Sequence, residues 1–270
     1  MMFLWHFGAR IARTVLPPSF IKKLRGDRKS VHARWILDPK ERLSLMFHRL
    51  KGGTYLSWYA RRMDGFAAQH QVIDLTDGKS YFDSGMEDLE VIKKLGVKPH
   101  HRLHEFGCGA LRSARYFIEY LDKGNFSAND TSGERITYGT RRWRAEGLDL
   151  IEAKQPLLIA STDNSFAWLN GRKVDYIWCH AVFGHMPPED VKETVANMKS
   201  VLNPGGAIIL TYGENPYNTK EVLRTSVKDW YHSRRFFLAI AAANGMTIEE
   251  CGDDINDAYP DDDVLIMRPS

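Results

Sequence analysis

The chain has 270 residues, of which 43% are hydrophobic and 26% are charged, and its net charge is +3. This length and apolar content can bury one sizeable core with an appendage, which excludes a disordered chain. The sequence contains no continuous run of about eighteen apolar residues, so it predicts no membrane-spanning helix. It also lacks the apolar core and small-residue cleavage site of a signal peptide at its N-terminus.

The three cysteines, Cys108, Cys179 and Cys251, lie far apart in the chain. Their spacing indicates neither a disulfide framework nor a zinc site, because both need cysteines grouped in recognisable patterns. We therefore expect a cytoplasmic protein that binds no metal.

The charge is unevenly distributed along the chain. Residues 1–65 hold 14 Lys or Arg against 4 Asp or Glu, a balance of +10, whereas the rest hold 23 against 30, a balance of −7. A basic leader suits an anionic partner such as lipid head groups, nucleic acid or an acidic substrate, and a solvated helical face would carry the same charges. We expect residues 1–79 to form a basic helical extension that acts as a lid or docking arm.

The first sixteen residues predict an amphipathic helix that ends at Pro17-Pro18. Its apolar side carries Leu4, Phe7, Ile11 and Val15. A helix with basic residues opposite such a stripe can lie on a membrane surface, so residues 1–26 are a candidate for peripheral membrane contact. The same stripe also suits packing against the rest of the protein, which we favour.

A short apolar run reaches Glu105 and then Gly107-Cys108-Gly109, just where an amphipathic helix is expected to begin. Glycine lets the chain bend sharply and lets a ligand approach the main chain closely. A carboxylate at the strand end favours a cationic or hydroxyl-bearing ligand over a phosphate. The pattern therefore indicates a nucleoside-binding turn.

Asp130 ends the next predicted strand, Phe126–Asp130, twenty-one positions after Gly109. An acid at this distance from the glycine turn is suited to binding both ribose hydroxyls. A pyrophosphate-binding turn would need a further glycine where Arg112 stands, so the sequence disfavours a nicotinamide oxidoreductase.

Taken in order, Glu105, Gly107, Gly109 and Asp130 resemble the first motif and the ribose acid of the class I S-adenosylmethionine-dependent methyltransferases. The turn Asn203-Pro204-Gly205-Gly206, after Leu202, is a further feature of this family. The chain departs from the family at Leu111, where a glycine is usual. The sequence therefore does not predict the angle at which the chain enters the following helix. The resemblance extends over residues 80–250.

This resemblance implies a three-layer α/β, Rossmann-like fold in residues 80–270, with a doubly wound, mainly parallel sheet and an antiparallel C-terminal strand. The later predicted strands are Leu157–Ala160, Val174–Cys179, Ala207–Leu210, Met246–Cys251 and Asp263–Met267. A long helix containing Trp230 and Tyr231 is expected before Asn244-Gly245. We expect His104 to be a surface or hinge residue.

The implied cofactor is S-adenosylmethionine, with S-adenosylhomocysteine as the product. The candidate cofactor-binding residues are Glu105, Gly107, Cys108, Gly109, Asp130, Thr131, Asp163, Asn164 and His180. By resemblance, Glu105 acts near the methionine amino group, Asp130 binds the ribose, and Asp163 is our candidate for reading the adenine. Asp163 and Asn164 also suit a plain surface turn, and Thr131 opens a predicted capping box with Glu134.

Acceptor chemistry is expected after the fourth strand, where His180 and His185 follow. A hydroxyl acceptor needs a base, and imidazole is the side chain best suited to that task near neutrality, so we choose His185 first and His180 second. Either histidine could instead bond to a neighbouring carbonyl and position the loop. Tyr55, Tyr59 and Tyr212 are the candidate substrate-binding residues, although core packing would use the same aromatics.

We expect methyl transfer to a hydroxyl or amine of a small-molecule or glycan acceptor. The alternatives are a methyltransferase-like binding module recruited to an anionic partner or membrane, and a nucleic-acid methyltransferase. The segment Asn215-Pro216-Tyr217 superficially resembles a motif of enzymes that methylate DNA bases, but it lacks one proline and follows the fifth strand, not the fourth. We therefore do not favour nucleic acid as the acceptor.

Overall fold

The computed structural model describes residues 39–68, 84–213, 222–224, 226–252, 255, 258–259 and 262–270. Within them, two helices, α4 (Pro39–Leu50) and α5 (Tyr55–Ala68), precede an α/β unit. The amphipathic segment 1–16, the predicted domain boundary at residues 79–80 and the segment Asn215-Pro216-Tyr217 lie outside the described residues.

A seven-stranded sheet with the order β3-β2-β1-β4-β5-β9-β8 forms the centre of the α/β unit. Its strands are β1 (Leu103–Phe106), β2 (Phe126–Asp130), β3 (Leu157–Ala160), β4 (Val174–Cys179), β5 (Leu202–Tyr212), β8 (Met246–Glu250) and β9 (Asp263–Pro269). The first five strands are parallel, and β9 runs antiparallel to both of its neighbours, β5 and β8. The predicted fold class is confirmed.

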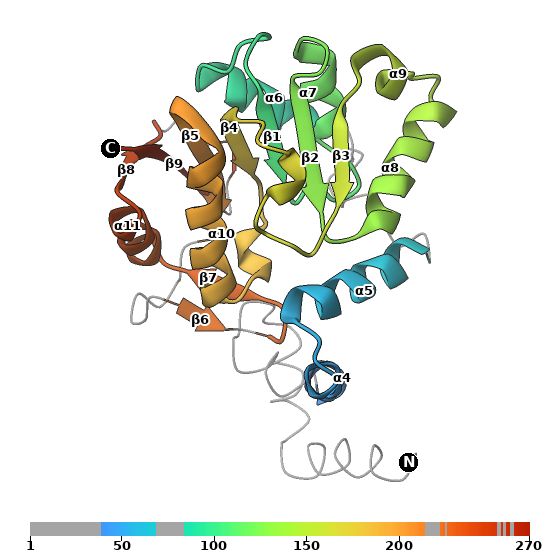
Figure 1. The fold of residues 1–270 in the computed structure, drawn as a ribbon, viewed down its shortest axis with the longest axis vertical. Helices are drawn as coiled ribbons and strands as arrows, with labels where there is room; N and C mark the ends of the chain where they lie inside the picture. The colour runs from blue at the N-terminus through green and yellow to red at the C-terminus, as the bar shows by residue number, and fades with distance from the viewer. Residues whose placement is uncertain are drawn as a thin grey trace, which may run out of the picture.

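Helices cover both faces of the sheet (Figure 1). One apolar core lies between the sheet and α6 (Gly85–Lys94), α7 (Ala114–Tyr120) and α8 (Gly133–Ala145), with the short α9 (Leu150–Lys154) at its end. The other core lies between the sheet and α10 (Pro188–Val201) and α11 (Arg234–Ala243), together with the 3-10 turns η1 (Ala167–Leu169) and η2 (Phe183–His185). These two cores hold the strands so that all carboxyl ends of β1 to β4 meet at one edge.

His104 lies inside β1 and is fully buried, so its expected place at the surface is wrong. Its two ring nitrogens contact Ser127 Oγ at 3.0 Å and Asn129 Oδ1 at 2.9 Å, both on β2. Burial lowers the pKa of His104 to about 4, against hydrogen bonds that act in the opposite direction. The strand tolerates the polar ring because each nitrogen has a partner.

The segment around Trp230 and Tyr231 was expected to be the start of a long helix, and the structure corrects this. It forms a hairpin of β6 (Val222–Arg224) and β7 (Trp230–His232), and α11 begins only after Ser233. Ser233 Oγ caps the helix by accepting from the Phe236 amide at 3.2 Å. Trp230 is buried because the Tyr55 ring packs edge-on against it, with 5.2 Å between centroids.

The N-terminal helices pack on this hairpin through a third, smaller core. Its buried members are Leu45, Tyr55, Trp58, Val227 and Trp230. This core fixes α5 beyond the carboxyl ends of β2 and β3, as the ribbon shows (Figure 1). No helix in the described ranges is long and apolar enough to span a bilayer.

Candidate functional site

A cavity of about 470 Å³ opens at the carboxyl ends of β1, β2 and β4. Most of the predicted site residues line it, namely Glu105, Gly107, Cys108, Gly109, Asp130, Thr131, Asn164, His180, His185 and Tyr59. Parallel strands place their carboxyl ends together, so acids and histidines that are distant in the chain converge here.

The glycine turn after β1 leaves bare main chain along the cavity. Gly107 has φ +75°, and a Cβ there would lie 2.5 Å from Val182 Cγ2. Gly109 has φ +53°, and a Cβ there would lie 2.7 Å from Arg135 Nη2. Both positions favour glycine through their positive φ, and Gly107 also requires it on steric grounds, because Val182 cannot move aside as the end of the Arg135 side chain can.

Leu111 takes the conformation for which the family normally uses glycine. Its φ is +63°, and its side chain is fully buried in the core beneath α7. A left-handed non-glycine residue costs about 1–2 kcal/mol, whereas burying a leucine side chain contributes about 1.5–3 kcal/mol. The turn is therefore kept without the third glycine, and α7 starts later than the sequence pattern indicated, at Ala114.

Asp130 is tied to the glycine turn from the end of β2. Its Oδ2 accepts a hydrogen bond from the Gly109 amide at 2.9 Å, and its Oδ1 accepts one from the Ser132 amide at 2.8 Å. These two bonds fix the carboxylate plane, and lone pairs remain on both oxygens for a ligand. Asp130 and the turn thus form one rigid wall of the cavity.

Glu105 lies next to this wall and is 5% exposed. Among the described residues, its Oε2 has no hydrogen-bond partner. Burial raises the pKa of Glu105 well above its ordinary value, and the nearby carboxylates of Asp88 and Asp130 raise it further against the opposing Arg112. A buried carboxyl group without a partner in a cavity favours a ligand that brings a positive charge or a hydrogen-bond donor.

A second group of polar side chains, which sequence reasoning missed, surrounds the fully buried Asp88 of α6. Arg112 Nη2 donates to Asp88 Oδ2 at 2.8 Å, and Ser113 Oγ donates to the same oxygen. The Tyr259 hydroxyl donates to Asp88 Oδ1 at 2.8 Å, and His180 Nδ1 lies 2.9 Å from that oxygen. Burial alone would raise the pKa of Asp88, but His180 and Arg112 outweigh it, so the pKa lies below its ordinary value.

This arrangement places His180 between a donor and an acceptor. Its Nδ1 lies 3.0 Å from Arg112 Nη2 as well as 2.9 Å from Asp88 Oδ1. One ring nitrogen cannot serve both partners with a single proton, so the tautomer of His180 is not fixed by its contacts. The contacts favour a structural role for His180 in joining α6, α7 and β4.

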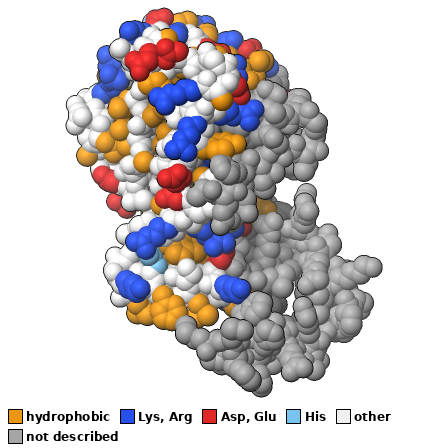
Figure 2. Space-filling model, turned by 90° about the vertical axis from the view of Figure 1, so that its right-hand side faces the viewer, with side chains coloured by type: hydrophobic (Ala, Val, Ile, Leu, Met, Phe, Trp, Pro, Cys, Tyr) orange, Lys and Arg blue, Asp and Glu red, His pale blue; other side chains and the backbone are white. Residues whose placement is uncertain are grey.

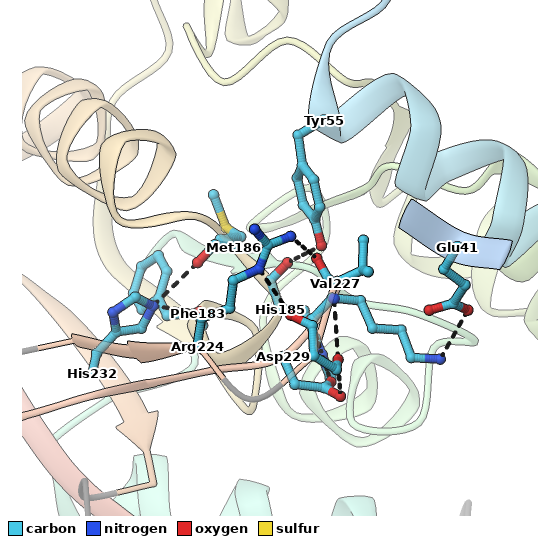
Figure 3. A network of polar contacts seen from close by, with 11 residues as sticks. Glu41, Tyr55, Phe183, His185, Met186, Arg224, Val227, Asp229 and His232 are labelled. Atoms are coloured by element: carbon cyan, nitrogen blue, oxygen red, sulfur yellow. Dashed lines mark hydrogen bonds and ion pairs between the residues drawn. The ribbon is translucent and has the colours of Figure 1, made fainter. Parts of the chain in front are cut away.

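His185 has a different environment, because both close partners of its Nδ1 are acceptors. Nδ1 lies 3.2 Å from Asp229 Oδ1 and 3.3 Å from the Lys228 carbonyl oxygen (Figure 3). Ser226 Oγ donates to the other oxygen of Asp229 at 2.7 Å. Burial pushes the pKa of Asp229 up, but the hydrogen bonds from His185 and Ser226 outweigh it, so the pKa is lowered. Two acceptors beside Nδ1 favour the neutral tautomer that carries its proton there, which leaves Nε2 to accept one.

The helix α5 roofs the cavity. Leu56 and Tyr59 line it, and the Tyr59 ring stacks on His185 with 5.9 Å between centroids. At one end of α5, the Tyr55 hydroxyl donates to the His185 carbonyl at 2.9 Å. Towards the other end, Asp64 Oδ1 accepts from Ser132 Oγ at 2.6 Å. The roof is thus fastened to both sides of the cavity.

Four predicted residues are placed differently from expectation, and one of them, Tyr55, is buried in the core beside the hairpin and does not line the cavity. Asp163 is exposed and bonds locally to Ser165, whereas its neighbour Asn164 lines the cavity. Tyr212 packs against Phe237 in the core of α11 and does not line the cavity. The cap of α8 is Ser132, whose Oγ accepts from the Arg135 amide at 3.2 Å, and not Thr131 as the capping box predicted.

Residues 104–208, which include the glycine turn and β1 to β4 almost entirely, match a family model described as a methyltransferase domain. This part of the chain is thus similar to a methyltransferase domain, and the predicted resemblance is confirmed. Leu111 is a departure from the pattern within the matched residues.

Solved structures with the same fold extend the likeness beyond residues 104–208. A magnesium protoporphyrin IX methyltransferase (ChlM) from Synechocystis PCC 6803 with bound SAM aligns with a TM-score of 0.58 at 14% identity, over 80% of this chain and 98% of that one. A DhpI-SAM-HEP complex aligns with a TM-score of 0.54 at 16% identity, over 77% and 95%. The glycopeptide N-methyltransferase MtfA aligns with a TM-score of 0.54 at 14% identity, over 70% and 91%.

Proposed function

We propose that the chain binds S-adenosylmethionine in the 470 Å³ cavity and transfers its methyl group to a hydroxyl or amine of a small-molecule or glycan acceptor. The observation that carries the proposal is the placement of Glu105 and Asp130. Both carboxyl groups open onto one cavity, with the bare main chain of Gly107 and Gly109 between them.

The residues of the cavity fit the parts of this cofactor. The unpartnered Oε2 of Glu105 suits the cationic amino group, and the fixed carboxylate of Asp130 suits the two ribose hydroxyls. Asn164 replaces Asp163 as our candidate: its Nδ2 donates to Thr194 Oγ1 at 2.8 Å, and its second N–H and its Oδ1 remain for the adenine. Neighbours of the same fold were solved with SAM and SAH, which supports the assignment.

The cofactor supplies a methyl group on a sulfonium, whose positive charge disappears as the methyl group moves to a nucleophile. The protein must hold donor and acceptor in line and exclude water, and this positioning lowers the barrier without covalent catalysis. The roof formed by α5, fastened through Tyr55 and Asp64, performs the exclusion. Tyr59, on the cavity side of this helix, faces the acceptor.

For a hydroxyl acceptor, His185 acts as the general base. Asp229 and the Lys228 carbonyl hold the proton on Nδ1, so Nε2 takes the proton of the acceptor. Asp229 is a positioning residue, because it acts on His185 and does not line the cavity. His180, held by Asp88 and Arg112, keeps the glycine turn and α6 in place.

A small-molecule acceptor is supported by the neighbours, which include a magnesium protoporphyrin IX methyltransferase and a glycopeptide N-methyltransferase. The dimensions of the cavity agree, since pockets for ligands of this size have volumes of about 300–1,000 Å³.

Calorimetry with the full chain tests the cofactor, and transfer of a labelled methyl group to a panel of hydroxyl and amine compounds tests the reaction. We expect Asp130→Ala to weaken S-adenosylmethionine binding at least about tenfold, since a hydrogen bond to a charged group is worth about 1.5–3 kcal/mol. Asp122→Ala, an exposed acid outside the cavity, is the matched control. Unchanged affinity in Asp130→Ala would refute the ribose assignment, and cofactor binding without transfer to any acceptor would favour a binding module.

A further inference from the structure

The exposed face of α4 carries a stripe of large apolar side chains far from the cofactor cavity. Leu43, Met46, Phe47 and Leu50 are 52%, 46%, 52% and 74% exposed. Their spacing of three, four and seven residues puts them along one side of the helix, while Glu41 and Leu45 face the protein from the opposite side. Only two other large hydrophobic residues of the described chain, Met86 and Leu238, are comparably exposed.

Basic residues flank this stripe. At 3.6 residues per turn, Arg42 and Arg49 fall on one flank of α4 and Lys40 falls on the other, with Lys51 just beyond the helix end. The patch is visible in the space-filling view, where apolar side chains at the lower end of the molecule lie between Lys and Arg side chains (Figure 2).

The single acid of α4 does not oppose this charge. Glu41 is 5% exposed, and its carboxylate pairs with Arg62 and, at 3.7 Å, with Lys228 Nζ (Figure 3). Every ionic side chain that α4 presents to solvent is therefore basic, which is the charge pattern that complements an anionic surface.

A second cavity of about 370 Å³ lies beside the stripe, between α4 and α5. Its lining includes Lys51, Arg61 and His48, and it shares Phe47 with the stripe. A basic hollow next to exposed apolar side chains complements both parts of a phospholipid. The hollow suits the anionic head group, and the apolar side chains suit the acyl chains.

We propose that α4 and this hollow dock on the surface of a bilayer that contains anionic phospholipid. The stripe enters the boundary between head groups and acyl chains, and Lys51 and Arg61 bind the phosphate of a head group. The helix lies parallel to the surface, in keeping with a length of 12 residues that is too short to cross a bilayer.

The docking surface and the cofactor cavity share α5 as a wall. Leu56 and Tyr59 face the cofactor cavity, whereas Trp58, Arg61 and Arg62 face the basic hollow. Docking therefore places the roof of the cofactor cavity against the bilayer, but it does not depend on methyl transfer and can be tested without an acceptor.

Co-sedimentation of the full chain with vesicles tests the proposal. We expect binding to vesicles of phosphatidylcholine mixed with phosphatidylserine and little binding to phosphatidylcholine alone. The variant Phe47→Ser/Leu50→Ser should bind the mixed vesicles at least about tenfold more weakly, and Lys51→Glu/Arg61→Glu should do the same by removing the attraction to anionic lipid. Leu238→Ser, on α11, is the matched control and should bind as the parent does. Thermal unfolding of each variant verifies that it is folded.

Three outcomes would overturn the proposal. If the parent chain does not bind the mixed vesicles, or if Phe47→Ser/Leu50→Ser binds them as well as the parent does, α4 is not the docking surface. If instead the parent is a dimer in solution that Phe47→Ser/Leu50→Ser converts to a monomer, the stripe is covered by a second copy and not by lipid. Sedimentation velocity of both proteins decides that point.

Discussion

Leu111, in the turn before α7, packs directly against Gly139 of α8. A Cβ on Gly139 of α8 would lie 2.9 Å from Leu111 Cβ and 2.4 Å from the Ala110 carbonyl oxygen. The turn that lacks its third glycine thus fits against α8 because α8 has a glycine opposite. Gly139 therefore leaves the space that the Ala110 carbonyl and the Leu111 side chain occupy.

The first prediction concerns the strain at Leu111. Leu111→Ala should lower the free energy of unfolding by about 2–5 kcal/mol, because it removes a buried side chain. Leu111→Gly removes one more carbon but relieves the left-handed φ, so it should be no less stable than Leu111→Ala. Denaturant unfolding of both variants measures this. If Leu111→Gly is less stable than Leu111→Ala by about 0.5–1 kcal/mol, the ordinary order for these residues, the φ of Leu111 carries no strain.

The second prediction concerns Gly139. In an open helix, replacing glycine by alanine usually stabilises by about 0.5–1 kcal/mol. At Gly139 the new methyl group would overlap the Ala110 carbonyl, so Gly139→Ala should instead destabilise by about 1–3 kcal/mol. Gly65→Ala, on α5, is the control, since nothing lies within 4 Å of its added Cβ. Thermal unfolding that moves both variants in the same direction would contradict the contact.

The third prediction concerns acid stability and His104. The unfolded chain protonates a histidine near pH 6.5, whereas burial lowers the folded pKa of His104 to about 4. The unfolded state binds the extra proton, so the stability contributed by neutral His104 is complete above pH 6.5 and is lost as the pH falls towards 4. The loss is on the order of 3 kcal/mol. His104→Gln should lack this part of the pH dependence in urea unfolding between those limits, and an unchanged slope would show that His104 does not titrate as its burial demands.

The fourth prediction concerns Glu105 and the cofactor. Burial raises the pKa of its carboxyl group, and a cationic ligand would favour the ionised form. Binding of S-adenosylmethionine should therefore release a proton where Glu105 is protonated in the free protein, and its affinity should rise with pH. Calorimetry in buffers of different ionisation enthalpy counts the released protons. Glu105→Gln should release fewer, and an equal release by both proteins would remove Glu105 from the amino-group site.

The fifth prediction concerns His185 and Asp229 with an acceptor found in the panel. His185→Gln should lower kcat for a hydroxyl acceptor by about 10²–10⁴, the usual contribution of a general base. Asp229→Asn should lower kcat at least about tenfold without changing the affinity for S-adenosylmethionine. The reason is that the carboxylate would no longer hold the proton of His185 on Nδ1. In the His185→Gln background, Asp229→Asn should have little further effect. An equal loss in both backgrounds would show that Asp229 acts independently of His185.

The fold could be predicted largely from the sequence because its signals are local. The strands at Phe126–Asp130 and Val174–Cys179 appear at the predicted residues, each bounded by turn residues nearby. The hairpin of β6 and β7 was not foreseen, since its three-residue strands are too short to show an alternating pattern. Trp230 is fixed by its packing on Tyr55, a contact that no local pattern reveals.

The candidate site divides in the same way. Glu105, Asp130 and the two glycines follow from one ordered motif, and the sheet brings them together. The environment of Asp88 could not be predicted from a sequence motif, because its partners His180 and Tyr259 lie 92 and 171 residues further along the chain. The choice between Asp163 and Asn164 depended on which of two adjacent loop residues turns towards the cavity, and sequence alone does not distinguish them.

The position of β9 has a consequence for how the protein acquires its structure. This strand follows β5 and β8 in the chain, yet it pairs between them. Until it inserts, β5 has a free edge and β8 has no partner in the sheet, so the intermediate exposes the kind of edge that promotes aggregation. Such long-range pairing also slows folding, because the chain must close a large loop before the contact forms. Newly synthesised molecules should therefore depend on molecular chaperones until this last insertion is complete.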